Sequence, residues 1–214
     1  MITDGSTLQI MTLAMGLGAL HALDADHLAV VTSLGSRRPG WRHALGFTLR
    51  WALGHALSLI ALATLLLVTA RNFAEQLGGT AEQLAGFSLI AIALWLLAHP
   101  LHPSVDRAAF HNGDPPRPNR SPLLATALGL LHGVAGSAPI LALIPLTQLQ
   151  RPVEMLYFVL LFSSGVVLSM CLVGFLIGHF WQRIHHRSHG VARLLHRLVA
   201  CTTLAIGARL LLVH

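Results

Sequence analysis

The sequence predicts an all-α integral membrane protein with six transmembrane helices, arranged as a 3+3 inverted-topology repeat. Three observations predict this fold. Hydrophobic residues make up 54% of the 214 residues and charged residues only 10%, and the mean hydropathy of +0.67 is too high for a soluble globular protein. Six apolar stretches are long enough to cross a bilayer as helices. One offset of 111 residues aligns parts of the two halves of the chain.

The six stretches follow one another along the chain, and a bilayer crossing takes roughly 20 residues of helix. We therefore expect spans at about residues 7–30, 43–69, 82–100, 121–148, 153–180 and 192–213. They fill the chain, so we expect a single transmembrane domain, 1–214. Its first three-helix half is 1–105, its second half is 117–214, and a cytoplasmic linker joins them at 106–120.

The arginines set the expected topology. The chain has no lysine, and its net charge of +6 comes from fourteen arginines against eight acidic residues. Most of them follow the first, third and fifth spans, at Arg37, Arg38, Arg42, Arg107, Arg117, Arg120, Arg183, Arg187 and Arg193. Because positively charged loops stay in the cytoplasm, we expect a multi-pass protein of the inner cell membrane with both termini outside. Topology accounts for the positive charge, so we expect no nucleic-acid partner.

The internal repeat relates two pairs of spans. It aligns Leu17–His21 with Leu128–His132, and without a gap it also aligns Gly54, Leu57 and Ser58 with Gly165, Leu168 and Ser169. Two copies of a unit with three crossings enter the membrane in opposite directions, which is the architecture of many secondary transporters. After the shared histidine the second copy continues with Gly133–Pro139. That segment is typical either of a backbone that lines a cavity or of close helix packing.

Polar side chains gather within the apolar spans. The candidate metal ligands are His21, Asp24, Asp26 and His27 in the first span, His55 in the second and His132 in the fourth. A charged group inside a bilayer costs about 3 kcal/mol or more unless a partner, an ion or water meets it, so such residues are functional by default. At about 1.5 Å of rise per residue, the histidines lie near the middle or the cytoplasmic half of the bilayer. Imidazole with carboxylate suits nickel, cobalt, zinc or iron, whereas calcium and magnesium prefer more oxygen ligands.

On a continuous first helix, His21, Asp24 and His27 lie on neighbouring faces while Asp26 points elsewhere. We therefore expect His21 and Asp24 to hold one cation together, and Arg50 to pair with Asp26. A hydrogen-bonded structural role is the alternative for His55 and His132 taken singly.

Outside this group, His185, His186 and His189 have a helical spacing that could hold a metal loosely. Solvated loop residues are the alternative reading there. Cys171 and Cys201 are expected to be small buried side chains rather than a redox pair.

Two motifs resemble those of a known family. The segment His21-Ala-Leu-Asp-Ala-Asp-His27 resembles the HxxxxDH signature of the nickel/cobalt transporter family, and Leu53-Gly-His-Ala-Leu-Ser58 resembles the motif of that family's following helix. The resemblance implies that His21, Asp26, His27 and His55 bind nickel or cobalt. The fourth span is similar only to the wider NicO and urease-accessory-like membrane proteins. The chain departs from the classical transporters at Gly133–Pro139, where they carry an acidic motif with threonine, and it has fewer spans.

Together these features predict a secondary permease for a divalent transition metal, nickel or cobalt, with alternating access to a His/Asp site. We expect no enzymatic activity and no resident cofactor. The expected partners are the metal ion, the lipid bilayer, and a cytoplasmic metal acceptor or a second copy of the chain. A chain without lysine has no GxxxxGK[ST] motif for ATP, so transport would be coupled to an ion gradient, to protons or to metal trapping.

Three alternatives stay open. An intramembrane metal-dependent enzyme is one, since His21 and Asp26 also fit the loose HxxxxD pattern of acyltransferases. A metal-supplying accessory protein for metalloenzyme maturation is another. A thiol–disulfide electron carrier is disfavoured, because Cys171 and Cys201 do not lie at the repeat offset.

Overall fold

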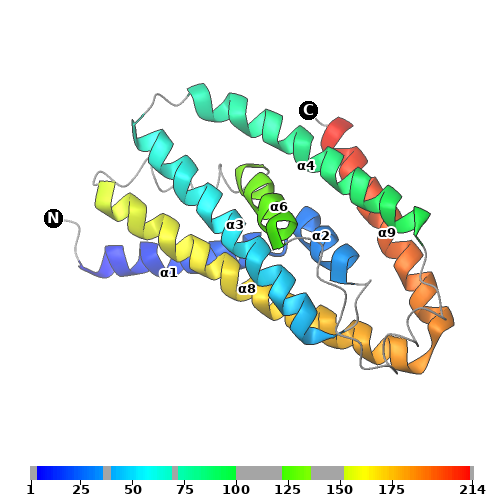
Figure 1. Cartoon of the computed structure of the whole chain (residues 1–214). Helices are drawn as coiled ribbons and strands as arrows, with labels where there is room; N and C mark the ends of the chain where they lie inside the picture. The colour runs from blue at the N-terminus through cyan, green and yellow to red at the C-terminus, as the bar shows by residue number, and fades with distance from the viewer. Residues whose placement is uncertain (1–3, 36–39, 69–71, 100–121, 136–151, 213–214) are drawn as a thin grey trace.

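The computed structural model describes residues 4–35, 40–68, 72–99, 122–135 and 152–212. Within these ranges the chain is helical and has no strand (Figure 1), which confirms the all-α class. The helices are α1 (Asp4–His21), α2 (Ala25–Gly35), α3 (Trp41–Val68), α4 (Asn72–Ala98), α6 (Pro122–Val134), α8 (Pro152–Arg187) and α9 (His189–Leu212).

Three of the described helices are long and apolar enough to cross a membrane. These segments are Trp41–Leu65 in α3, Val153–Ile184 in α8 and Gly190–Leu212 in α9, at the predicted spans 43–69, 153–180 and 192–213. Shorter apolar helices, Glu82–Ala98 and Leu123–Val134, lie at the third and fourth predicted spans. The predicted linker, 106–120, lies outside the described residues. The helix lengths and composition indicate a membrane protein.

The outer surface of these helices is apolar. Leu53 and Leu57 on α3, and Leu168 and Leu172 on α8, are large hydrophobic side chains that are each more than half exposed. Many large hydrophobic side chains are exposed in this way on the described helices, which indicates a surface covered by another apolar phase. Lipid is the phase that the span lengths predict.

The predicted first span, 7–30, is wrong as a single helix. α1 ends at His21, and the backbone N–H of Asp24 donates to the carbonyl of His21 at 3.0 Å in a tighter turn. α2 begins at Ala25, and the carbonyl of Asp24 accepts the first bond of the new helix from Leu28 at 3.0 Å. Asp24 therefore stands at the N-cap of α2, a position that aspartate favours. A short break thus divides the span at its polar residues.

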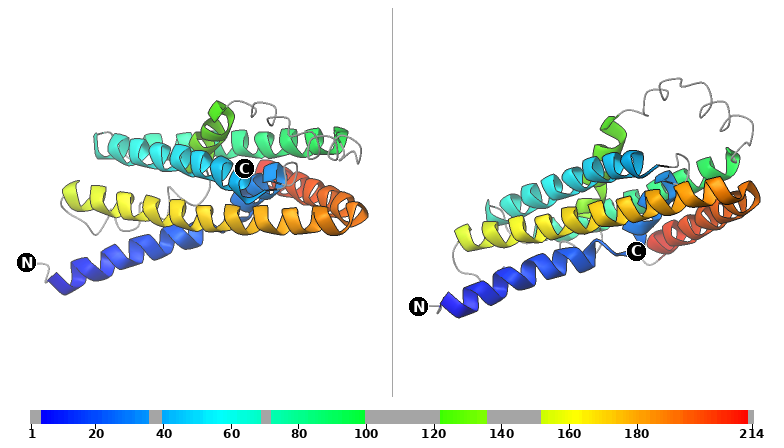
Figure 2. Two further views of the ribbon diagram at one scale, coloured as in Figure 1. Left: turned by 60° about the horizontal axis from the view of Figure 1, so that its bottom comes forward. Right: turned by 90° about the horizontal axis from the view of Figure 1, so that it is seen from below.

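The long helices pair across the two halves of the sequence. α3 and α8 lie side by side and run in opposite directions, and so do α4 and α9 (Figures 1 and 2). α1 packs on α8, and α6 packs on α3. α2 packs on α9, where the buried hydroxyl oxygens of Ser33 and Thr203 lie 2.7 Å apart in a hydrogen bond. Each helix of the first half therefore has a main partner in the second half.

Glycines bring the backbones together where α1 meets α8 and where α6 meets α3. A Cβ atom added to any of four glycines would fall less than 3.0 Å from backbone atoms of the facing helix. The contacts repeat at the offset found in the sequence: Gly18 faces Phe162 as Gly129 faces Trp51, and Gly165 faces Met15 as Gly54 faces Thr126. The two helix pairs are therefore packed in the same way.

α3 and α8 are in close contact near the first turns of α3. A Cβ on Gly174 would lie 2.8 Å from the Cβ of Thr48, and one on Gly178 would lie 2.7 Å from the Cα of Trp41 and from the Cβ of Ala44. Because glycine has no side chain, it permits this distance between the helices. These two glycines therefore bring α8 against the first two turns of α3.

Candidate metal centre

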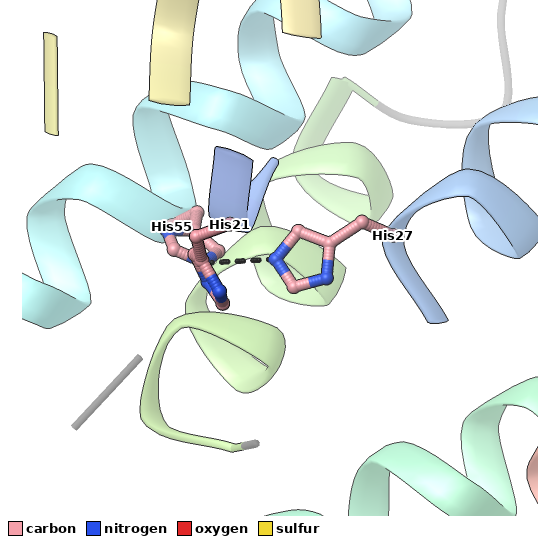
Figure 3. A group of neighbouring side chains, drawn as sticks. All are labelled: His21, His27 and His55. Atoms are coloured by element: carbon pink, nitrogen blue, oxygen red, sulfur yellow. Dashed lines mark hydrogen bonds between the residues drawn. The ribbon is translucent and has the colours of Figure 1, made fainter. Parts of the chain in front are cut away.

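Three histidine side chains converge at the break between α1 and α2. His21 is the last residue of α1, His27 lies in the first turn of α2, and His55 lies near the middle of α3. All three are buried, with at most 2% of their surface exposed. One ring nitrogen of each lies within 4.8 Å of those of the other two. Figure 3 shows His27 reaching from α2 toward the other two rings.

The convergent atoms are the Nε2 nitrogens. The Nε2 of His55 lies 3.3 Å from the Nε2 of His21 and 3.1 Å from the Nε2 of His27. A divalent transition metal with histidine ligands sits about 2.1 Å from each nitrogen. Three nitrogens at these separations can therefore bind one ion with small side-chain movements.

Each aspartate holds the other ring nitrogen of one histidine. Asp24 Oδ2 lies 2.9 Å from His21 Nδ1, and Asp26 Oδ1 lies 2.9 Å from His27 Nδ1. A carboxylate on the far nitrogen fixes the tautomer and orientation of a metal-binding imidazole. His21 and Asp24 lie together, as the sequence indicated, but they meet at the break between α1 and α2, and Asp24 contacts the ring nitrogen of His21 that faces away from the cluster. In this arrangement both acidic side chains orient the imidazoles.

The hydrogen bonds assign the ring protons. An ionised Asp24 or Asp26 accepts from Nδ1–H, so a neutral His21 or His27 has a bare lone pair at Nε2. Two such lone pairs face the single Nε2 of His55, which can carry one proton. The converging Nε2 atoms of three neutral rings therefore hold at most one proton, that of His55. A cation placed between the three Nε2 atoms can bind their lone pairs when His55 carries its proton on Nδ1.

His132 lies beside this cluster in the last turn of α6. Its Nδ1 lies 2.8 Å from the carbonyl oxygen of Leu128, one turn earlier in the helix. Its Nε2 is buried and has no hydrogen-bond partner among the described residues. The ring centroid of His132 lies 6.2 Å from that of His27. The sequence placed His132 with the other ligands, whereas the structure places it next to the group of three nitrogens and outside it.

Two helix ends also favour a cation here. α1 ends at His21, and α6 ends two residues after His132. The last carbonyl groups of a helix carry a partial negative charge, which stabilises a cation near the C-terminus. Broken helices place such ends at the ion sites of many transporters.

Aromatic side chains surround the nitrogens. The ring of Trp51 lies 4.9 Å from that of His27 and 5.4 Å from that of His55, and Phe162 lies 5.7 Å from His21. Trp51 and Phe162 are fully or almost fully buried. The sequence analysis did not single out Trp51 or Phe162. The two aromatic residues are 111 residues apart, which is the offset of the internal repeat, and this equivalence was the available signal. They make the immediate surroundings of the site apolar.

The remaining sequence predictions have mixed outcomes. Arg50 does not pair with Asp26, because it is exposed on α3 and donates to the carbonyl of Gly46 at 2.8 Å. A Cβ on Gly133 would meet Ser58 and the backbone of His55, so close packing accounts for this glycine. Cys171 and Cys201 are free, but they are half-buried and exposed respectively, not buried as expected. The side chains of His185, His186 and His189 lie outside those described.

The fold and the site define a helical membrane protein with a buried histidine cluster suited to a divalent transition metal. The chain is similar to the urease accessory protein UreH of Bacillus sp. (strain TB-90), with 28% identity over 177 residues that cover 80% of this chain and 77% of the relative. No protein-family model and no solved structure matches the chain. The similarity agrees with the expected likeness to urease-accessory-like membrane proteins, and membership of the nickel/cobalt transporter family stays a prediction.

Proposed function

We propose that this protein is a secondary permease for divalent transition-metal ions, nickel or cobalt, and that it exposes an intramembrane histidine site alternately to the two sides. One observation carries the proposal. The Nε2 atoms of His21, His27 and His55 converge in a buried place, and carboxylates hold two of the three rings by their other nitrogen. Such an arrangement suits a borderline metal ion.

The ligand atoms narrow the substrate class. Three imidazole nitrogens favour nickel, cobalt, zinc or iron, whereas calcium and magnesium select sets of oxygen atoms. The resemblance of His21–His27 and Leu53–Ser58 to the nickel/cobalt transporter motifs implies the first two metals. The similar protein UreH is named as a urease accessory protein. We therefore propose that the metal imported by this chain serves the maturation of a metalloenzyme.

The helix arrangement supports alternating access. α3 and α8, and likewise α4 and α9, run in opposite directions (Figure 1), and equivalent glycines pack α1 on α8 and α6 on α3. This is the pattern expected of two inverted halves with three spans each. We propose the six-span 3+3 topology in the inner membrane, with both termini outside as the arginines indicate. The cycle as proposed includes no covalent step and no resident cofactor.

Metal flux into proteoliposomes tests the proposal. Purified protein is reconstituted around a trapped dye that cobalt and nickel quench, and uptake is compared for the wild type, His55→Ala and His43→Ala. His43 is an exposed histidine on the same helix as His55, which makes it a matched control. We expect uptake by the wild type and His43→Ala, and a loss of at least about tenfold in His55→Ala. Folded wild-type protein that moves no divalent transition metal would overturn the proposal.

A further inference from the structure

We infer that His132 is a second, receiving ligand on the path of the metal ion. In the described conformation the ion is held by His21, His27 and His55, and it passes to His132 when His21 withdraws. This inference rests on the proposed transport function and deepens it. It assigns to the four histidines two successive positions of the ion in place of one four-ligand site.

The repeat makes His132 the counterpart of His21. Both histidines lie in the last turn of a helix that ends in the apolar interior, α1 in one half and α6 in the other. Three residues before each of them is a glycine that packs against the backbone of a buried aromatic residue, Phe162 for Gly18 and Trp51 for Gly129. The two histidines therefore occupy equivalent places on opposite halves, and only His21 belongs to the present cluster.

His132 has the correct nitrogen available. Its Nδ1 donates to the Leu128 carbonyl at 2.8 Å, so a neutral ring has its lone pair on Nε2. That Nε2 is buried and without a partner in the described part of the chain. Buried polar atoms are nearly always satisfied, so an orphan beside a metal-binding cluster points to a ligand. The ring of His27, a member of the present site, is nearly perpendicular to that of His132, and their centroids lie 6.2 Å apart.

The packing also places His21 on one helix pair and His55 with His132 on another. Gly54, Gly129 and Gly133 hold α6 against the backbone of α3, so His55 and His132 move together. His21 is on α1, which Gly18 and Gly165 hold against α8. α8 is joined to α3 through Gly174 and Gly178, near the start of α3. A tilt of α1 with α8 about that contact takes His21 away from His55, while His132 stays with His55 on the α3–α6 pair. The ion then has two nitrogens on the α3–α6 pair.

Equilibrium binding and flux, measured on the same variants, test this order of events. Cobalt is the probe, since its visible absorption reports the ligands around it. We compare His132→Cys with His132→Ser, two side chains of nearly equal size of which only the thiolate is a good ligand for cobalt. His21→Ala is the reference for loss of a ligand in the present cluster.

We expect both His132 variants to bind cobalt within about threefold of the wild type, because the three-nitrogen site stays intact. Flux is expected to fall by at least about tenfold in His132→Ser and to be largely retained in His132→Cys. His21→Ala is expected to lose both binding and flux. Gel filtration and thermal unfolding of each variant establish that it is folded.

Several results would overturn the inference. If His132→Ser loses binding as strongly as His21→Ala, His132 is a ligand of the same site and there is one position. If cobalt flux is normal in both His132 variants, or falls equally in both while cobalt binding stays intact, His132 has a packing role. A wild type that neither binds nor transports cobalt would instead refute the proposed function itself, and the handover with it.

Discussion

Replacement of Gly18 by alanine tests the packing that positions His21. Gly18 and Gly16 lie two residues apart on α1, but they face different surroundings. A Cβ at position 18 would lie 2.8 Å from the carbonyl carbon of Phe162 and closer still to its oxygen, whereas a Cβ at position 16 meets nothing within 4 Å. Gly16→Ala is therefore the matched control for Gly18→Ala.

The geometry sets the magnitude of the effect. The obstacle at position 18 is backbone, which cannot rotate away, so α1 and α8 must separate by on the order of 1 Å. Overpacking of this kind costs about 1–3 kcal/mol. Both variants gain about 1 kcal/mol of helix propensity when glycine becomes alanine, so that contribution cancels between them. In a chain of this size 1 kcal/mol corresponds to roughly 2–4 °C in Tm, and we expect Gly18→Ala to unfold roughly 2–12 °C below Gly16→Ala.

Thermal unfolding in detergent and cobalt titration form the assay. His21 lies three residues after Gly18, so a shift of α1 also moves His21 Nε2 relative to His55, and cobalt affinity should fall together with Tm. Gly129→Ala, at the equivalent place on α6, should lower Tm to a similar extent. Equal Tm and equal cobalt affinity in Gly16→Ala and Gly18→Ala would refute the packing argument.

Two further predictions concern the polar groups of the site. Asp26→Asn should weaken cobalt binding by about 10- to 100-fold. Asp24→Asn should weaken it by less, because the side chain of Asp24 is 41% exposed and that of Asp26 only 14%. Cobalt titration of both variants gives the two affinities, and equal losses would contradict this ranking. Three neutral rings keep their three protons when they bind an ion, because the proton of His55 moves from Nε2 to Nδ1. Cobalt binding near neutral pH should therefore release less than one proton per ion, and it should weaken in acid, since a ligating imidazole is neutral. A pH indicator in weak buffer counts the protons, and release of one or more per ion would contradict the three neutral rings.

The residues of the site were predictable because polar groups stand out in an apolar sequence. His21, His27 and His55 converge as the sequence indicated, for the physical reason that a buried imidazole needs a partner. The helical class and three membrane-length helices were also predictable from hydropathy. The offset between equivalent histidines reappears in the contacts of the glycines.

The break after His21 was not predictable, because Ala22 and Leu23 are ordinary helix residues and the segment contains neither glycine nor proline. The N-cap preference of Asp24 was the one local signal, and it competed with a continuous apolar pattern. Without the break, Asp24 is assigned to the cation and Asp26 to Arg50. With it, both carboxylates turn to histidine Nδ1 atoms and Arg50 faces outward.

The close contact between α3 and α8 at Thr48 and Trp41 would act as a pivot if the two helices move relative to each other. Helices joined closely at one end can tilt about that end, and the displacement of any point then grows with its distance from the contact. His55 lies about 10 Å along α3 from Thr48, and Leu65 lies about 25 Å from it. An opening of several ångströms at the far end of the helix pair therefore moves His55 by less than half as much. A wide movement at the Leu65 end of α3 would thus become a small displacement of the His55 ring.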